Sequence, residues 1–291
     1  MIAYLLGVDG GGTGTRVVIA QTDGTVLAQG QAGPSALGQG IAPAWHHIVQ
    51  ATAAAFASIG QDTPAGSVCA MGAGLSGINH RPWADEFRAT NPGFAKLVLE
   101  SDAHTMLLGA HDGQPGAIVA AGTGSVGEVL RRDGSCSQVS GWGFPVGDEG
   151  SGAWLGLRAM AIAQQALDQR CAPSPLADAV QAGCGTRREA LLAWCATARQ
   201  FEYAQLAPLV FKCAHADPVA NDLLIQAAAA LDAMALALDP GGTLPLAVCG
   251  SVGQLLQPRL GRATLARCVD PRFDALHGAL ILIRAALEAP Q

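Results

Sequence analysis

The stretch GTGTRVVIAQTDG, Gly12–Gly24, returns without a gap 110 residues later as GTGSVGEVLRRDG, Gly122–Gly134. Both copies begin with Gly-Thr-Gly, end with Asp-Gly and follow an apolar run, at residues 3–8 and 117–121. This pattern is typical of a strand, a glycine turn, a second strand and a hairpin turn. The repeat therefore predicts two related halves, each built around one glycine turn.

Each glycine turn is a candidate phosphate site. Binding phosphate through the backbone requires N–H groups that point at its oxygens, and glycine permits both the close approach and positive φ angles. A single Gly-Thr-Gly is equally consistent with a tight hairpin. Its recurrence at an equivalent place in both halves favours phosphate binding.

Length and composition predict two domains and a small ligand. The chain has 291 residues, and half of them are apolar, which supplies enough core for more than one domain. The formal net charge is −6 and the only lysines are Lys96 and Lys212. Because the sequence forms no basic stripe, nucleic acid and anionic membranes are poor candidate partners.

The eight cysteines indicate a reducing compartment. They show no Cys-x-x-Cys spacing, and the N-terminus Met1–Leu5 has no basic signal-peptide start. We therefore expect free thiols in a cytoplasmic protein. The longest apolar helical stretch, Leu223–Leu238, contains Gln226 and Asp232 and falls short of bilayer length, so it is expected to be a core helix.

Alternating strand-like and helix-like segments predict an α/β layer fold. In the first half, strands are expected at 2–8, 16–20, 25–29, 67–72 and 96–100, and helices at 41–59, 82–90 and 103–111. In the second half, helices are expected near 151–171, 186–199, 203–215, 218–238 and 274–289, with a strand at 245–249. Pro173, Pro175 and the segment Pro240–Gly242 are expected to mark loops.

Two aspartates follow predicted strands. Asp9 comes between the first strand and Gly10–Gly12, where a carboxylate would repel phosphate unless it held Mg²⁺; the alternative is an Asp that caps a turn. Asp102 follows the strand at 96–100, at the edge of the sheet where α/β proteins bind ligands. There it could accept the proton of an attacking hydroxyl or serve as a helix N-cap, and its position leaves both readings open.

Two further segments combine glycine with binding chemistry. Gly141–Gly152, GWGFPVGDEGSG, contains aromatic and acidic residues that suit a sugar ring and its hydroxyls, although a structural Ω-loop is the alternative. Ser151 could cap the helix that follows. Leu246–Gly253 joins a strand to a glycine turn that could receive a nucleoside. The sequence contains neither a P-loop motif nor a Rossmann-type turn that leads into a helix.

Three of these segments together carry a family resemblance. DGGGT at Asp9–Thr13, AGTGS at Ala121–Ser125 and the Gly141–Gly152 loop resemble the sugar-kinase, actin and Hsp70 superfamily. Within it they are most similar to the N-acetylglucosamine and glucosamine kinases of the BadF/BadG/BcrA/BcrD ATPase-like group. The resemblance reaches from Gly7 to RFDALHGA, Arg272–Ala279, and Asp102 falls where these kinases carry a catalytic aspartate.

The resemblance implies two ribonuclease-H-like domains of the actin-like ATPase type that flank an ATP cleft, and usually a homodimer. The first would span residues 1–112 and be joined by the last helix, at about 274–289. The second would span 113–273 and contain helical insertions. The implied cofactors are ATP and Mg²⁺, and the implied partner is a small amino sugar.

The family's roles are carried over residue by residue. Asp9 would bind the metal and Asp102 would be the base. The residues expected to hold ATP are Gly11, Gly12, Thr13, Gly14, Gly122 and Thr123 at the phosphates and Gly250, Ser251 and Val252 at the adenosine. The residues expected to line the sugar are Ser35, Thr123, Gly124, Trp142 and Asp148.

One departure from the family concerns the sugar. Where relatives often read Gly-Pro-Ser-Asn, this chain has Gly33-Pro34-Ser35-Ala36, so a sugar-binding amide is missing. A lost hydrogen bond of this kind costs roughly 1 kcal/mol. Ser35 or Gln39 would be the residues to compensate for it.

The sequence supports one main hypothesis and two alternatives. In the main hypothesis, the 6-hydroxyl of glucosamine or N-acetylglucosamine attacks the γ-phosphate of MgATP, with Asp102 as the base. The first alternative is an ATPase that activates a dehydratase through an iron–sulfur cluster, which would need paired exposed cysteines. The second is a non-catalytic sugar or nucleotide sensor, which would need neither Asp9 nor Asp102.

Overall fold

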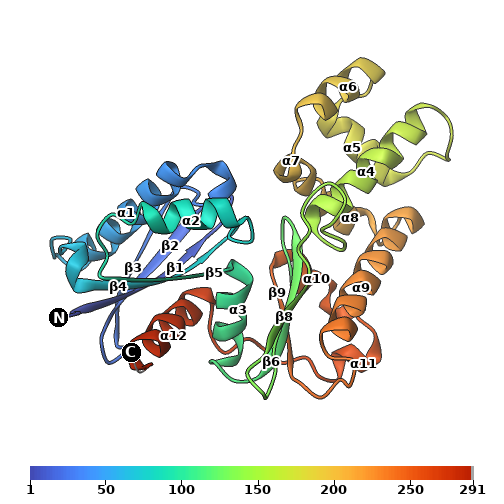
Figure 1. Cartoon of the computed structure of the whole chain (residues 1–291). Helices are drawn as coiled ribbons and strands as arrows, with labels where there is room; N and C mark the ends of the chain where they lie inside the picture. The colour runs from blue at the N-terminus through green and yellow to red at the C-terminus, as the bar shows by residue number, and fades with distance from the viewer. Residues whose placement is uncertain (290–291) are drawn as a thin grey trace. The chain divides into compact units, whose positions relative to one another are not determined.

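The computed structural model describes residues 1–289 and divides into two compact units (Figure 1). Unit 1 comprises residues 1–115 together with the chain from Asp270 onward. Unit 2 comprises residues 116–269. Each unit has its own mixed sheet and its own hydrophobic core.

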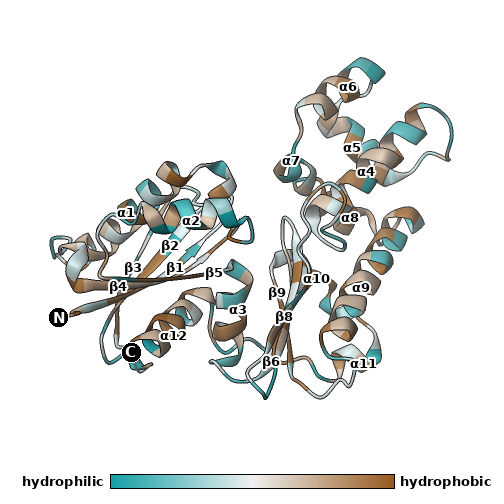
Figure 2. Ribbon diagram, in the orientation of Figure 1, coloured by the Kyte–Doolittle hydropathy of each residue, from teal (hydrophilic) through white to brown (hydrophobic). Residues whose placement is uncertain are grey.

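Unit 1 is built on a five-stranded sheet with the order β3-β2-β1-β4-β5. Its strands are β1 (Tyr4–Gly10), β2 (Thr15–Gln21), β3 (Val26–Ala32), β4 (Cys69–Leu75) and β5 (Lys96–Glu100). The hairpin β1-β2-β3 is antiparallel, whereas β1, β4 and β5 run parallel. All five strands occur where the hydrophobic pattern predicts them. β4 is buried along its whole length, and Figure 2 shows hydrophobic residues along this part of the sheet.

Helices cover both faces of this sheet (Figure 1). They are α1 (Ile41–Ala57), α2 (Arg81–Ala89), α3 (Asp102–His111) and α12 (Ala275–Glu288), with 3-10 turns at η1 (Leu37–Gln39) and η2 (Gly66–Val68). On one face, Trp45 of α1 stacks on Phe87 of α2 with ring centroids 3.9 Å apart. On the other, Leu276 and Ile283 of α12 pack against Leu5 of β1. The C-terminal helix therefore completes the core of unit 1.

The C-terminal helix approaches its neighbours so closely that glycine is required. A Cβ atom at Gly278 would lie 1.8 Å from the carbonyl oxygen of Thr105 in α3, and one at Gly72 would lie 2.1 Å from the carbonyl oxygen of Ala279. Both contacts are with backbone, which cannot move aside as a flexible side chain does. Such overpacking forces the elements apart.

Gly278→Ala is therefore expected to lower the free energy of unfolding by about 2 kcal/mol or more. Urea denaturation followed by circular dichroism measures the change. Gly183→Ala is the matched control, because Gly183 also lies in a helix but a Cβ there would meet no atom within 4 Å. That substitution is expected to be neutral or slightly stabilising, and equal losses in the two variants would contradict the packing argument.

Unit 2 repeats the strand arrangement on a smaller scale. Its four-stranded sheet has the order β8-β7-β6-β9, with β6 (Gly116–Ala121), β7 (Ser125–Leu130), β8 (Cys136–Ser140) and β9 (Leu246–Cys249). As in unit 1, an antiparallel hairpin lies beside a parallel strand, here β9. The two glycine turns occupy equivalent places, between β1 and β2 and between β6 and β7.

Unit 2 is rich in helix. Its helices are α4 (Gly152–Leu167), α5 (Pro175–Cys184), α6 (Arg188–Thr197), α7 (Gln200–Ala204), α8 (Ala207–Cys213), α9 (Pro218–Leu238), α10 (Ser251–Leu256) and α11 (Arg262–Leu265), with a 3-10 turn at η3 (Gln257–Arg259). Two sequence predictions need correction. The helix expected at 203–215 is two short helices, and Pro175 begins helix α5, where Ser174 caps the N-terminus. Proline is well tolerated at a first helical position because its missing N–H would be unpaired there anyway.

Helix α9 has the bounds that the sequence predicts, residues 218–238. It has 21 residues and, among the described helices, is the one long and apolar enough to cross a membrane by length and composition alone. The prediction of insufficient length rests on the apolar stretch Leu223–Leu238 alone and does not hold for the whole helix. Its buried face, which includes Leu224, Leu231 and Leu238, joins the core of unit 2 and contacts strands β6 to β8.

Candidate functional site

The first glycine turn leaves backbone donors unpaired at its tip. Gly11 N–H donates to the Gly14 carbonyl (3.0 Å), which closes the turn. Gly12 and Thr13 are exposed, and within residues 1–289 their N–H groups have no hydrogen-bond acceptor. The space beside Gly11 is open, since a Cβ there would meet nothing within 4 Å. Unpaired N–H groups beside open space are what an anion site requires.

Asp9 is held beside this turn by Arg16. Its Oδ2 accepts hydrogen bonds from Arg16 Nη2 (2.7 Å) and Nε (3.2 Å), while Arg16 Nη1 donates to Asp274 Oδ2 (2.9 Å). Burial by itself would lower the pKa of Arg16, but the two carboxylates outweigh it and raise that pKa. Asp9 Oδ1 has no partner in the described part of the chain and is available to a ligand.

The donor set around Asp9 fits a magnesium ion bound mainly by a ligand and water. Among residues 1–289, no group of three His, Cys, Asp or Glu side chains could hold a metal ion. Mg²⁺ is commonly bound by one or two carboxylates plus substrate phosphates and water. One free carboxylate oxygen beside a phosphate-type turn matches that mode.

Asp102 is the first residue of α3, directly after β5. Ser101 caps this helix by accepting a hydrogen bond from His104 N–H (3.0 Å), so the N-cap reading of Asp102 is wrong. Asp102 Oδ1 accepts from Ala103 N–H (3.0 Å). Because β1, β4 and β5 are parallel, their carboxyl ends share one edge of the sheet. The same edge therefore carries Asp9, the glycine turn and Asp102, as expected for an α/β ligand site.

Ser35, predicted as a sugar contact, lies inside the loop that follows β3. Its side chain is buried, and its hydroxyl accepts a hydrogen bond from Thr15 Oγ1 (2.7 Å), so it links the loop to β2. Its N–H and that of Ala36 both donate to the Gly11 carbonyl. Gln39 is exposed and donates to the Gly12 carbonyl (3.1 Å), so its side chain remains beside the turn.

The second glycine turn is joined to the N-terminus of α4. Gly122 N–H donates to the Gly124 carbonyl (2.9 Å), while Gly152 N–H donates to the Gly122 carbonyl (2.8 Å) and Ala153 N–H to the Thr123 carbonyl (3.1 Å). Ser151 caps α4 by accepting from Trp154 N–H (3.2 Å), which confirms the predicted cap. The Gly141–Gly152 loop therefore ends directly on the turn.

Asp148 is the buried acid of this loop. Asp148 is only 3% exposed. Its Oδ1 accepts a hydrogen bond from Ser125 N–H (3.2 Å), and its Oδ2 accepts one from Gln200 Nε2 (2.7 Å). Burial raises the pKa of the Asp148 carboxyl, and these two hydrogen bonds only partly oppose the rise. Trp142, the aromatic of the same loop, is 87% exposed and presents its ring to solvent.

A cavity of about 380 Å³ in unit 2 brings together residues from both predicted nucleotide segments. Gly122 and Thr123 of the turn lie on one side, and Ser251 and Val252 of α10 on another. Gly250 precedes α10 with φ +79°, and a Cβ there would lie 2.3 Å from the Ala121 carbonyl oxygen. The close approach of these two strand ends requires this glycine.

The apolar wall of this cavity was not among the predicted site residues. The wall comes from α7, α8 and the residues between them: Ala204, Gln205, Ala207, Pro208 and Phe211. No motif marks this segment, because its residues are those of an ordinary apolar helix.

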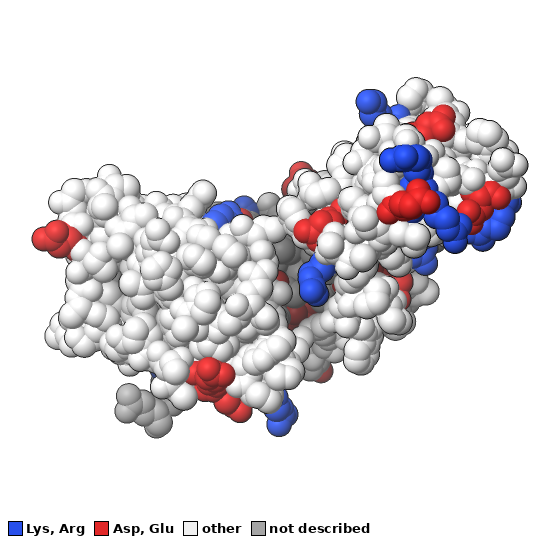
Figure 3. All heavy atoms as spheres, turned by 90° about the horizontal axis from the view of Figure 1, so that it is seen from above, with Lys and Arg blue, Asp and Glu red and all other residues white. Residues whose placement is uncertain are grey.

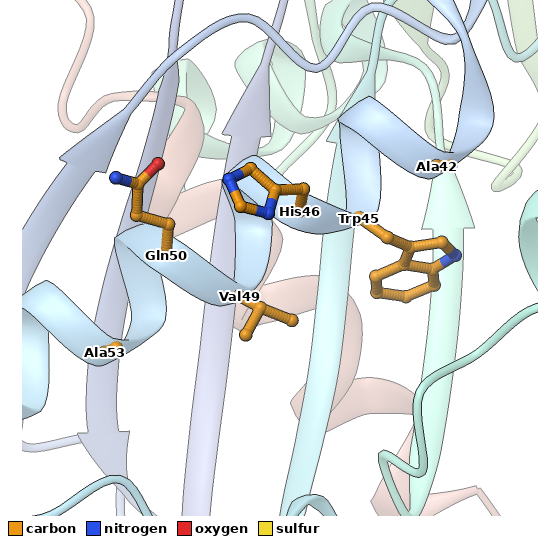
Figure 4. Close-up of a pocket in the computed structure, with 6 residues that line it drawn as sticks. All are labelled: Ala42, Trp45, His46, Val49, Gln50 and Ala53. Carbon is orange, nitrogen blue, oxygen red and sulfur yellow. The ribbon is translucent and has the colours of Figure 1, made fainter.

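A second cavity, of about 360 Å³, is separate from all of these residues. Figure 4 shows its lining along α1: Ala42, Trp45, His46, Val49, Gln50 and Ala53. None of the predicted site residues lines it. It is a shallow apolar depression over one helix, and its lining contains no Asp, Glu, Lys or Arg.

Surface charge is mixed in sign. Figure 3 shows acidic and basic side chains gathered together on one part of the visible face. Ion pairs of this kind in unit 2 include Asp168 with Arg170 and with Arg188. Mutual pairing of this kind leaves little unbalanced positive charge to attract a polyanion.

Comparison with known proteins identifies the family. The family model described as the BadF/BadG/BcrA/BcrD ATPase family matches residues 6–282. Glucosamine kinase GspK of Vibrio cholerae is 33% identical over 280 residues, covering 96% of this chain and 95% of that protein. N-acetyl-D-glucosamine kinase of Dictyostelium discoideum is 26% identical over 248 residues, covering 78% and 76%.

A solved structure agrees with the sequence comparisons. A crystal structure of a Chromobacterium violaceum protein, provisionally named an N-acetylglucosamine kinase, is 50% identical and superimposes with a TM-score of 0.94, covering 97% of this chain and 99% of that one. The predicted α/β fold with two actin-like ATPase domains is thereby confirmed. This chain belongs to the BadF/BadG/BcrA/BcrD ATPase family.

Proposed function

We propose that this protein is an ATP-dependent amino-sugar kinase that phosphorylates the 6-hydroxyl of glucosamine or N-acetylglucosamine. The observation that carries the proposal is the construction of unit 2, in which one turn serves two purposes. Gly122 and Thr123 line the cavity of about 380 Å³ that we assign to the nucleotide. The next two residues, Gly124 and Ser125, contact the buried carboxylate of Asp148. A phosphate donor and a hydroxyl-bearing acceptor are thus served by neighbouring residues.

ATP is assigned to the two glycine turns and the cavity. On unit 1, Gly11–Gly14 supplies unpaired N–H groups for phosphate oxygens. On unit 2, the N–H of Thr123 is the corresponding group, since Gly122 N–H donates to the Gly124 carbonyl, and Gly250–Val252 borders the adenosine. Phe211 and Pro208 give the cavity an apolar wall suited to a nucleobase.

Magnesium is assigned to Asp9 through its free Oδ1. Bound there, the ion would neutralise charge on the phosphates of ATP. Arg16 holds Oδ2 of the same carboxylate and so fixes the direction in which Oδ1 faces. The protein would therefore contribute to metal binding by orienting the Asp9 carboxylate.

The sugar is assigned to Thr123, Gly124, Trp142 and Asp148. A carboxylate is the strongest common acceptor for sugar hydroxyls, and an exposed indole suits the apolar face of a pyranose ring. Asp102 takes the proton of the 6-hydroxyl as that oxygen attacks the γ-phosphate. The bond from the γ-phosphorus to the β,γ-bridging oxygen breaks, and ADP leaves.

No observation favours the two alternatives. The named relatives are glucosamine and N-acetylglucosamine kinases, which supports phosphoryl transfer and not activation of a dehydratase. We extend the proposal to a cytoplasmic homodimer, on the strength of the family resemblance and of the free thiols of all eight cysteines.

The proposal is tested by ADP release with MgATP and a panel of glucosamine, N-acetylglucosamine, N-acetylmannosamine, glucose and buffer alone. An amino sugar is expected to stimulate release strongly. Hydrolysis that is independent of sugar would favour the activator reading, and the absence of turnover with every sugar would favour the sensor.

The raised pKa of Asp148 predicts the pH dependence of sugar use. The carboxylate accepts hydrogen bonds from hydroxyls only when it is ionised, and burial favours the neutral form. As the pH falls through this raised pKa, kcat/KM for the sugar is expected to decline tenfold per pH unit, beginning above the range of an ordinary exposed Asp. A pH profile measured at saturating MgATP checks this, and a flat profile down to pH 4 would contradict it.

A further inference from the structure

We propose that Gln200 is a positioning residue for sugar recognition: its carboxamide fixes the Asp148 carboxylate in the orientation that accepts hydrogen bonds from the sugar. The inference rests on the proposed kinase function. Gln200 is the first residue of α7, in a helical segment for which the sequence suggested no role in the site.

The contact between the two side chains is short and directional. Gln200 Nε2 donates to Asp148 Oδ2 at 2.7 Å, and Ser125 N–H holds Oδ1 at 3.2 Å. The nitrogen must face Asp148, because an ionised carboxylate only accepts. A carboxylate has about four lone-pair sites, so each oxygen keeps capacity for a ligand hydroxyl after these two bonds.

The second glycine turn leaves room for this contact. A Cβ at Gly124 would lie 2.9 Å from Asp148 Oδ1 and 3.1 Å from Gln200 Nε2. The glycine therefore lets both side chains converge on the turn, one residue from Thr123 in the cavity wall. The position that must be glycine for this contact is therefore also next to the cavity assigned to the nucleotide.

Helix α7 is itself held rigidly, so that Gln200 can position its partner. The Arg199 N–H donates to Glu202 Oε2 (2.8 Å), which ties the N-cap residue to the first turn of the helix. Glycine at 156 in α4 allows close packing, since a Cβ there would lie 1.8 Å from the Tyr203 carbonyl oxygen. The Tyr203 ring also packs on Phe144 of the Gly141–Gly152 loop, with centroids 5.4 Å apart.

The electrostatic surroundings give this contact a measurable signature. Burial raises the pKa of Asp148, the hydrogen bonds from Ser125 and Gln200 lower it, and the charge of Glu149 raises it. Arg158 in α4 interacts electrostatically with Glu149. Loss of the Gln200 bond therefore moves the pKa of Asp148 further up.

Gln200→Ala is expected to raise KM for the amino sugar about tenfold, to leave KM for MgATP unchanged, and to shift the acid limb of the sugar kcat/KM profile to higher pH. The matched control is Gln181→Ala, which removes one Gln side-chain hydrogen bond, to the Ala163 carbonyl, from helix α5 of the same unit. The control is expected to change neither KM nor the pH profile. An unmoved acid limb in Gln200→Ala, or equal effects of the two variants, would overturn the proposal.

Gln200→Glu provides a second, independent readout. It places two carboxylates in contact, so one of them must take up a proton. Activity at neutral pH is expected to fall well below that of Gln200→Ala and to recover in part as the pH is lowered. A residue with only a structural role would not give this inverted dependence, and its absence would count against the positioning role.

A titration of the Asp148 carboxyl by ¹³C NMR separates this inference from the proposed function. If no sugar stimulates ADP release by the wild type, the proposed function fails. The positioning claim is then decided by the titration alone: a higher pKa of Asp148 in Gln200→Ala supports it, and an unchanged pKa overturns it.

Discussion

Asp102→Ala is expected to lower kcat by about 10²- to 10⁴-fold, the usual contribution of a general base. The fold should survive, because Ser101 and not Asp102 caps helix α3. KM for MgATP should change little, since the variant loses the proton acceptor and keeps the glycine turn. Steady-state kinetics at saturating sugar and MgATP measures the effect.

The control for this substitution is Asp85→Ala. Asp85 is an exposed aspartate of unit 1 whose ion pair, with Arg88, lies on the surface of α2. We expect its kcat to match that of the wild type. Unchanged turnover in Asp102→Ala would remove Asp102 from the mechanism, whereas an equal loss in both variants would indicate a general effect on the unit.

Asp148→Asn is expected to lower kcat/KM for the amino sugar by about 10²-fold. Hydrogen bonds to a charged group contribute about 1.5 to 3 kcal/mol each, and the amide replaces one accepting oxygen by a donor. The backbone should tolerate the change, because Asp148 has φ +65° and asparagine is among the residues that accept this conformation. The variant also loses the acid limb of the pH profile, since an amide does not titrate.

Asp168→Asn is the matched control, because Asp168 forms exposed ion pairs in the same unit. It should leave kcat/KM within twofold of the wild type. If Asp148→Asn affected KM for MgATP as much as KM for the sugar, the assignment of Asp148 to the sugar would be wrong.

The glycine turns could be predicted from the sequence because their chemistry is local. Turn and strand signals lie within a few residues of one another, and the same hydrogen bonds recur in both halves. Asp23 Oδ1 accepts from Thr25 N–H (2.8 Å), and Asp133 Oδ1 accepts from Ser135 N–H (2.9 Å). The glycine turn between β1 and β2 is one residue longer than the one between β6 and β7, since Gly10 pairs with Thr15 but Ala121 pairs with Ser125.

What the sequence did not reveal depends on contacts between distant residues. Gln200 and Asp148 are 52 positions apart, and no spacing rule connects them. Phe211 enters the cavity wall only because α8 packs there, and the buried hydroxyl of Ser35 forms a hydrogen bond with Thr15, 20 positions away. Helix α5 was missed for a different reason: its proline was interpreted as a loop signal, although it stands at a first helical position.

The central claim is that the γ-phosphate of ATP is transferred to the 6-hydroxyl of an amino sugar. It is tested most directly by ³¹P–¹H correlation NMR of the products formed from MgATP and glucosamine or N-acetylglucosamine. The account predicts a phosphate resonance coupled to the two H6 protons of the sugar, in equal amount to the ADP formed. Phosphate recovered only in inorganic form, or attached to the anomeric oxygen, would contradict it.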